Sequence, residues 1–250
     1  VDTLGGSPQR TLAPYLVVRI HDAIASYTDV LLEDMVRRRF ERKNPYLKLV
    51  IRPFWGNDPA VANDPLIGIQ MTSLIQHPNK YYHTSQDTPD LLTKGDLEAV
   101  GPIPAAFAYF VANMSRLDAA WLLTRVASDG QCQLEGEFAE ASEAVLTALS
   151  NGPSAGPEAV ARAISSAAER MRYVEERVIR TLTSLLPIVE GEREWIAGMV
   201  AEAEGDIRRQ SAELLSRLHR LAPLASGTIS SLNLPSLMAA TAFTWLRSAH

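Results

Sequence analysis

One stretch of the sequence decides how the remainder is interpreted: Tyr82-His83-Thr84-Ser85-Gln86-Asp87-Thr88-Pro89-Asp90. It places one imidazole among hydroxyls, carboxylates and a proline, between a strand-like segment at Met71–Ile75 and a predicted helix. Loops that follow strands in α/β folds are where ligands and chemistry usually lie. Hydroxyl and carboxylate neighbours also orient a ring nitrogen toward a metal or a substrate. The structural alternative is a simple helix entry, with Asp90 or Thr93 as the N-cap.

Upstream of this stretch, strand and helix signals alternate. Short apolar or β-branched segments predict strands at Val1–Leu4, Leu16–Ile20 and Leu47–Arg52. Thr28 is expected to cap a helix that runs to about Lys43, with an apolar face and a charged face. Strands that alternate with helices favour a mostly parallel, layered α/β sheet.

Beyond about Asn113 the pattern becomes purely helical. Ala-rich segments run from about Leu117 to Leu149, and a Gly- and Pro-rich stretch at 151–157 predicts a linker. The next apolar positions alternate between spacings of four and three, as in the heptad seam of packed helices: Val160, Ile164, Ala167, Met171, Val174, Val178, Thr181 and Leu185. A second run contains Ile196, Val200, Ala203, Ile207, Gln210 and Leu214. The sequence therefore predicts two long antiparallel helices near 157–187 and 191–222, with one more short helix within 226–250.

Four motifs within residues 1–113, under half the chain, follow the order found in one enzyme family. His83-Thr84-Ser85 with Asp87-Thr88-Pro89-Asp90 resembles that family's final metal-ligand motif, and Val1–Gly6 resembles a strand ending in Asp-Met-(Val/Ile)-Gly. Gly56-Asn57-Asp58-Pro59 followed by Gly68-Ile69-Gln70 is similar to Gly-Ser-Asp-His followed by Gly-Ile-Pro, and Leu97–Ala112 resembles a closing helix. The family is that of the co-catalytic zinc aminopeptidases, metallopeptidase family twenty-eight, with the bacterial leucyl aminopeptidases and aminopeptidase Y.

This resemblance implies a fold and a set of site residues. The fold would be an α/β/α sandwich, and the site would hold two zinc ions and act on the N-terminus of a peptide. Asp2 and His83 would be ligands, each to a different zinc ion. Residues near the site or supporting its ligands would be Asp58, Asp87 and Tyr82. Trp55 would either wall an apolar substrate pocket or serve as a packing aromatic.

The sequence also departs from the family pattern. Pro59 stands where a His is expected, and Gln70 stands where a Pro is expected. The family's first His, its bridging Asp and its adjacent Glu pair, which includes the general base, would all precede Asp2. Catalytic zinc takes about three protein ligands, so this chain alone is not expected to assemble the site, and no catalytic residue is predicted within it. The chain is interpreted as the C-terminal part of a longer protein, with residues 1–115 in the peptidase-like α/β domain and 116–250 in a helical domain.

Composition limits the function classes. Hydrophobic residues at 46% and charged residues at 21% are typical of a globular protein with a core. A net charge of -5 disfavours nucleic acid as a partner, and no apolar run approaches the ~20 residues that span a bilayer. The single Cys132 excludes a disulfide framework and a Cys-rich zinc site. Because the N-terminus is taken to be missing, the compartment is left undetermined.

Three hypotheses follow, in order of preference. The first is the C-terminal segment of a zinc aminopeptidase that is active only in its full-length form. The second is an inactive peptidase-like binding protein, in which Pro59 and Gln70 mark a decayed site. The third is a helical module that drives homo-oligomerisation.

Overall fold

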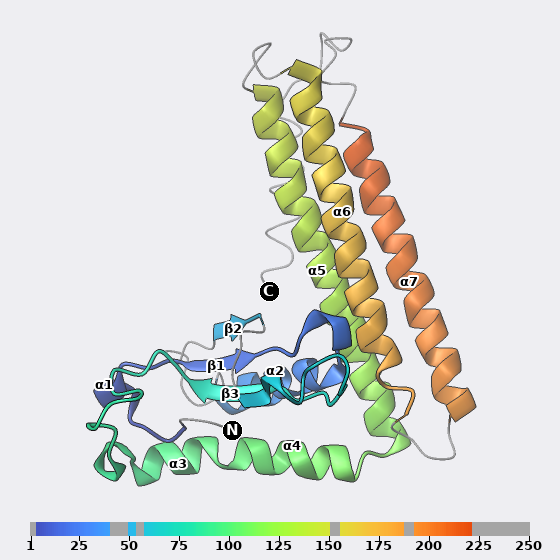
Figure 1. Ribbon diagram of the computed structural model, residues 1–250. Coiled ribbons are helices and arrows are strands. Elements are labelled where there is room, and N and C mark those ends of the chain that lie inside the picture. Colours follow the sequence, from blue (N-terminus) through green and yellow to red (C-terminus); the bar gives the residue numbers. More distant parts are fainter. Residues whose placement is uncertain (1–3, 41–49, 54–57, 151–155, 188–192, 222–250) are drawn as a thin grey trace. The chain divides into compact units, whose positions relative to one another are not determined.

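The computed structural model describes residues 4–40, 50–53, 58–150, 156–187 and 193–221 (Figure 1). Most of these residues are helical, and the chain divides into two units. The first contains Val1–Leu134 and Arg172–Ser211, and the second contains Glu135–Met171 and Ala212–His250. Three long helices contribute to both units: α5 (Arg116–Ser150), α6 (Gly156–Thr183) and α7 (Arg193–His219).

A small mixed sheet lies in the first unit. The described strands have the order β2 (Val50–Arg52), β1 (Tyr15–Val18), β3 (Ser73–Gln76). β1 is parallel to β2 and antiparallel to β3. The strands expected at Leu16–Ile20 and Met71–Ile75 are therefore present with shifted bounds, and the strand expected at Leu47–Arg52 is present over its described part, Val50–Arg52. Residues 47–49, and residues 1–3 of the strand expected at Val1–Leu4, lie outside the described residues. The described strands do not form a mostly parallel sheet, because β3 runs against its neighbour.

The central strand β1 is buried on both faces, as expected for a continuous apolar run. Tyr15 and Val17 belong to one core with residues of two helices, α2 (Tyr27–Phe40) and α4 (Pro102–Ala112). The ring of Tyr15 stacks on that of Phe40 with centroids 4.8 Å apart. Leu16 and Val18 form a second cluster with Ile75 on the opposite face. This packing fixes both ends of β1, from which two polar regions extend.

Helix α2 differs from the two-faced helix expected from its sequence. The Ser26 hydroxyl accepts a hydrogen bond from the Thr28 backbone N–H at 3.3 Å, so Ser26 and not Thr28 caps the helix. Asp29, Glu33 and Asp34 are all buried, although charged residues usually lie on the solvent side. The predicted separation into apolar and charged faces is therefore wrong for the first part of α2.

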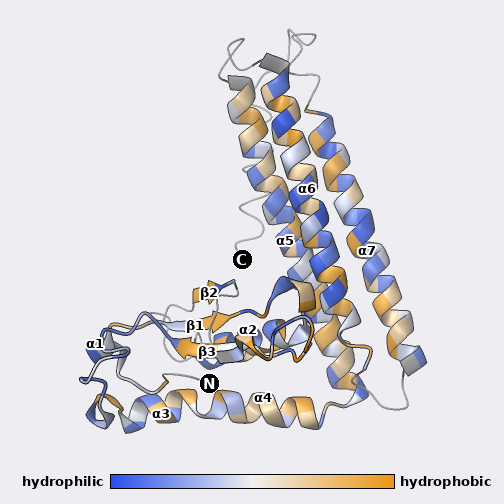
Figure 2. Cartoon of the chain, viewed as in Figure 1, coloured by the Kyte–Doolittle hydropathy of each residue, from blue (hydrophilic) through white to orange (hydrophobic). Residues whose placement is uncertain are grey.

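The single helix expected at Leu97–Ala112 is divided. It consists of α3 (Lys94–Val100) and α4, which meet at Gly101 and Pro102. Proline lacks an N–H to continue the helical ladder. Thr93 caps α3, since its Oγ1 accepts the Asp96 N–H at 3.1 Å, which confirms that capping alternative. Hydrophobic residues cover much of α4, which contains no charged side chain (Figure 2).

The helical seam predicted from the four-and-three spacing is confirmed. All of its apolar positions are buried: Val160, Ile164, Ala167, Met171, Val174, Val178, Leu185, Ile196, Val200, Ala203, Ile207 and Leu214. Thr181 and Gln210 are only partly buried, and their neighbours Leu182 and Ser211 are fully buried instead. In the first unit α5 and α6 approach closely at Gly130, where an added Cβ would lie 2.4 Å from Val178 Cγ1. The short helix expected within 226–250 lies outside the described residues.

Two surface properties bear on function. No described helix is both long enough and apolar enough to cross a membrane. Cys132, on α5, is exposed as a free thiol. Both observations concern the parts of the chain that the structure describes.

Candidate functional site

The loop that carries His83 begins directly after β3. The His77 N–H donates to the Pro14 carbonyl at 3.3 Å, and the Lys80 N–H donates to the Thr11 carbonyl at 3.1 Å. Both acceptors lie just before β1, so the loop is placed at the end of the sheet where β1 starts and β3 ends. The sequence correctly predicted a polar loop at a strand end.

His83 has an unusual backbone conformation and an accessible ring. Its φ is 57°, a left-handed value that is uncommon for residues other than glycine. The ring stacks on Tyr82 with centroids 3.8 Å apart and planes at 19°, and Tyr82 in turn meets the edge of His77 at 5.4 Å. Within the described residues, neither ring nitrogen of His83 makes a hydrogen bond. Left-handed residues cluster at active sites and ligand clamps. The imidazole of His83 is free to bind a ligand.

Short-range hydrogen bonds fix the shape of the loop. The Tyr81 carbonyl accepts two of them from Thr84, one from the hydroxyl at 2.7 Å and one from the N–H at 3.0 Å. The Asp87 N–H donates to the Thr84 carbonyl at 3.1 Å. The side chain of Asp87 is exposed and makes no bond to His83 in the described structure, so its supporting role stays a prediction.

Gln76, the last residue of β3, is 1% exposed and uses its side-chain amide in place of a strand backbone. Its Oε1 accepts the Gly6 N–H at 3.1 Å, and its Nε2 donates to the Gly6 carbonyl at 3.0 Å. This pair of bonds reproduces what a neighbouring strand would provide. It ties the N-terminal segment to the residue directly before the His83 loop.

The same N-terminal segment is also bonded to the far side of the loop. The Ser7 N–H donates to the Leu91 carbonyl at 3.1 Å, and the Thr93 N–H donates to the Gly5 carbonyl at 3.2 Å. Residues 5–7 are therefore held both before and after the loop that carries His83. They begin three positions after Asp2 in the sequence.

Several of the predicted site residues lie outside what the structure describes. Asp2 and Trp55 are not described, and of Asp58 only the backbone is, at the start of the 3-10 turn η2 (Asp58–Ala60). Tyr82, Asp87 and His83 share one loop. Among the described residues no group of three His, Cys, Asp or Glu side chains could hold a metal ion.

A second polar region occupies the opposite end of the sheet, where β1 ends and β3 begins. Arg19 forms a bidentate ion pair with Glu33 of α2, with Nε to Oε1 at 2.7 Å and Nη2 to Oε2 at 3.2 Å. The two side chains are 19% and 8% exposed, so the pair is largely withdrawn from water. Buried charges require partners of this kind.

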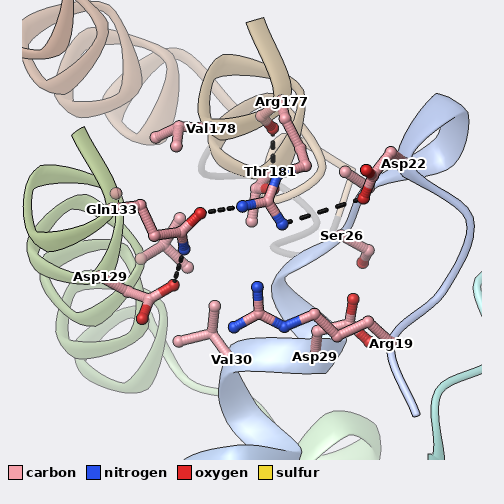
Figure 3. Close-up of a pocket in the computed structure, with 13 residues that line it drawn as sticks. Arg19, Asp22, Ser26, Asp29, Val30, Asp129, Gln133, Arg177, Val178 and Thr181 are labelled. Carbon is pink, nitrogen blue, oxygen red and sulfur yellow. Dashed lines mark hydrogen bonds and ion pairs between the residues drawn. The ribbon is translucent and has the colours of Figure 1, made fainter. Parts of the chain in front are cut away.

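Asp29 lies beside this ion pair. Both of its carboxylate oxygens accept the Ile20 N–H at 3.2 Å. Burial raises the pKa of Asp29 from 3.8 to about 7, an effect partly offset by hydrogen bonds from Thr72 and Ile20 and by the charge of Arg19. The adjoining cavity has a volume of about 20 Å³ (Figure 3), room for about one water molecule and not for a substrate.

Sequence reasoning missed this second region. Arg19 and Glu33 are 14 residues apart and meet only because α2 folds back along β1. Asp29 and Glu33 are four residues apart, which places them on one helix face, but that spacing is also typical of a solvated face. The single usable signal was Ser26, a better N-cap position for α2 than Thr28.

Comparison with protein-family models, curated proteins and solved structures gave no match to this chain. What points to a function in this chain is therefore the set of sequence motifs and the geometry of the His83 loop. That geometry is described for one candidate ligand, His83, and for the segment that follows the other, Asp2.

Proposed function

We propose that this chain is the C-terminal segment of a zinc-dependent aminopeptidase and that His83 is one of its metal ligands. The observation that carries the proposal is the exposed imidazole at φ 57°, in a loop whose two sides are bonded to residues 5–7. Because residues 5–7 closely follow Asp2, this bonding favours a shared site for Asp2 and His83. Imidazole and carboxylate are both common zinc donors.

The described donors fit zinc in kind but not in number. Catalytic zinc takes about three protein ligands, and His83 supplies one. Under this proposal Asp2 supplies one to the second ion, and the others come from residues that precede this chain in the full-length protein. The strands β1–β3 would then form part of a larger α/β/α sandwich.

Three residues in or beside the loop have a definable task in such a site: His83, Tyr82 and Gln76. Two zinc ions, when bound, lower the pKa of a shared water and polarise the scissile carbonyl. His83 offers a ring nitrogen, and stacking on Tyr82 limits rotation of the ring. Gln76 keeps the segment after Asp2 beside the loop. The general base is expected outside this chain, and a peptide N-terminus as substrate rests on family analogy.

The alternative is an inactive peptidase-like binding protein, suggested by the departures at Pro59 and Gln70. One observation weakens it. Gln70 Oε1 accepts a hydrogen bond from the Ser26 hydroxyl at 2.7 Å, and Ser26 caps α2. Gln70 therefore has a structural reason to be present, independent of any loss of activity. The third hypothesis, self-association through the helical seam, is weakened because the seam residues are buried within the chain itself.

The test compares zinc content and leucine-anilide hydrolysis in the protein that contains this chain together with the residues preceding it. Three forms are measured: the unchanged protein, His83→Ala and His21→Ala. His21 is the matched control, since it is also an exposed histidine but lies at the other end of β1. Metal analysis by mass spectrometry reports binding independently of activity.

We expect about two zinc ions per chain, with hydrolysis. His83→Ala should lose about one zinc ion and most of the activity. His21→Ala should keep its full zinc content and its activity. Zinc binding without hydrolysis in the unchanged protein would support the inactive peptidase-like alternative. Full zinc content and activity in His83→Ala would show that His83 is not a metal ligand.

A further inference from the structure

The connection between β1 and α2 is fastened to helix α6. Asp22, in the 3-10 turn η1 (Asp22–Ile24), accepts a hydrogen bond from the Tyr173 hydroxyl. Its Oδ1 lies 3.9 Å from Nη1 of Arg177, and its backbone carbonyl accepts the Nε–H of Arg180 at 3.2 Å. Three side chains of one helix therefore converge on one residue.

The same helix is linked to α5 through amide and carboxylate groups. Arg177 donates to the Gln133 side chain, and Gln133 donates to Asp129 (Figure 3). At the end of α6 the Tyr27 N–H, the first of α2, donates to the Ser184 hydroxyl at 3.0 Å. The start of α2 is thus enclosed by α5 and α6, with Asp29 facing the small cavity between them.

The charges around that cavity balance only while Asp29 is neutral. The ionisable groups around Asp29, from the elements packed against it, are Arg19, Asp22, Glu33, Asp129 and Arg177, with Tyr173 and Arg180 on the far side of Asp22. Three guanidinium groups therefore meet three carboxylates when Asp29 is neutral. Ionisation of Asp29 would add a fourth carboxylate to a space that holds about one water molecule. Asp29 accepts the Ile20 N–H, but among the described residues no further cation faces it to balance a fourth carboxylate, and an unbalanced buried charge is costly.

We propose that Asp29 operates a proton-dependent latch between the β1–α2 connection and residues 172–183 of α6, closed when its carboxyl group is protonated and loosened when that proton is lost. The latch consists of Asp22, Asp29, Tyr173 and Arg177. Loosening admits water to the Asp29 carboxylate and relieves the excess of negative charge. Loosening breaks the hydrogen bond from Tyr173 to Asp22 and the ion pair between Arg177 and Asp22.

The sign of the pH dependence follows from linkage. The closed state holds the Asp29 proton with a pKa of about 7, whereas water-exposed Asp29 in the open state has its ordinary value of 3.8. The closed state binds more protons, so closing is most favourable below pH 3.8 and weakens as the pH rises to about 7. The opening constant should rise about tenfold per pH unit across this window and level off above it.

Amide hydrogen exchange of residues 20–29 and 172–183 at pH 5–8, corrected for the intrinsic chemistry of exchange, measures this opening. The unchanged chain should lose protection in both segments by about tenfold per pH unit up to about pH 7. Asp29→Asn should show protection that does not depend on pH. Asp206→Asn, which removes an exposed carboxylate of α7, should behave like the unchanged chain.

A titration by NMR of the Asp29 carboxyl carbon in the unchanged chain gives an independent measurement. A midpoint near 7 supports the latch, and a midpoint near 4 overturns it. The latch is also overturned if protection in Asp29→Asn follows the same pH dependence as in the unchanged chain. If only residues 20–29 respond while residues 172–183 do not, the link to α6 is wrong.

Discussion

The two ends of the β1–β3 pair differ in how they hold polar groups. At the end that carries His83, the polar side chains are exposed, and the loop is held by backbone carbonyls and by the buried amide of Gln76. At the other end, Arg19, Glu33 and Asp29 are largely buried and hold one another. The first arrangement leaves an imidazole free for a ligand, and the second leaves no room for one.

This difference cautions against locating function by burial and pKa alone. A carboxyl group with a raised pKa in a cavity is a usual sign of a functional site, and Asp29 meets that description. Its cavity of about 20 Å³ excludes a substrate, however. The exposed loop, with its left-handed histidine, is the better candidate for chemistry. The buried region is suited to control the contact between the β1–α2 connection and helix α6.

The largest effect is expected from breaking the Arg19–Glu33 ion pair at the buried end of the strands. Arg19→Met leaves Glu33 without its bidentate partner, and the free energy of unfolding should fall by roughly 3–5 kcal/mol. Urea denaturation monitored by circular dichroism measures it. The control is Lys94→Met at the exposed Lys94–Glu98 pair, 3.7 Å long, where little change is expected. Equal losses in the two variants would contradict the contrast between the ends.

The next effect tests the His83 end. Gln76→Leu removes both hydrogen bonds to Gly6 and leaves a buried N–H and C=O without partners, at a cost of roughly 1–3 kcal/mol. Amide exchange at Gly6 and Thr93 should accelerate with it. Gln86→Leu, a substitution of an exposed glutamine in the same loop, should leave both measurements unchanged. A Gln76→Leu chain as stable as Gln86→Leu would show that the N-terminal segment is held by other contacts.

A smaller effect distinguishes crowding from backbone strain at two glycines, Gly5 beside the His83 loop and Gly68 in the segment before β3. Gly5 and Gly68 both have positive φ, 92° and 71°. An added Cβ at Gly5 would lie 2.3 Å from Leu97 Cδ2, whereas at Gly68 it would meet nothing within 4 Å. Gly68→Ala should cost about 1 kcal/mol from the backbone alone, and Gly5→Ala should cost more because Leu97 must move. Equal costs, measured by thermal unfolding, would mean that Leu97 moves freely.

The smallest effect concerns the ring stack. Tyr82→Leu removes the aromatic partner of His83, and because Tyr82 is 38% exposed the free energy of unfolding should change by less than about 1 kcal/mol. The proton shifts of the His83 ring should nevertheless move toward those of an unstacked imidazole. Tyr82→Phe keeps the ring and should preserve the shifts. Unchanged shifts in Tyr82→Leu would show that the stack does not persist in solution.

What the sequence could predict depended on how far apart the interacting residues lie. The seam from Val160 to Val178 was predictable because heptad spacing is a property of one helix. The polar loop at His83 was predictable because it follows an apolar run. The direction of β3 was not, since an antiparallel neighbour and a parallel one present the same local pattern over four residues. The Arg19–Glu33 pair also depends on a tertiary contact that no local pattern contains.

The lone cysteine of the chain has a practical consequence. Cys132 is exposed and directly precedes Gln133, whose amide accepts from Arg177 of the latch. A maleimide dye would therefore attach at one position, beside the α5–α6 contact, without any engineered substitution. Its emission during a pH jump would report the opening rate of the latch in real time, in a chain whose sequence is otherwise unaltered.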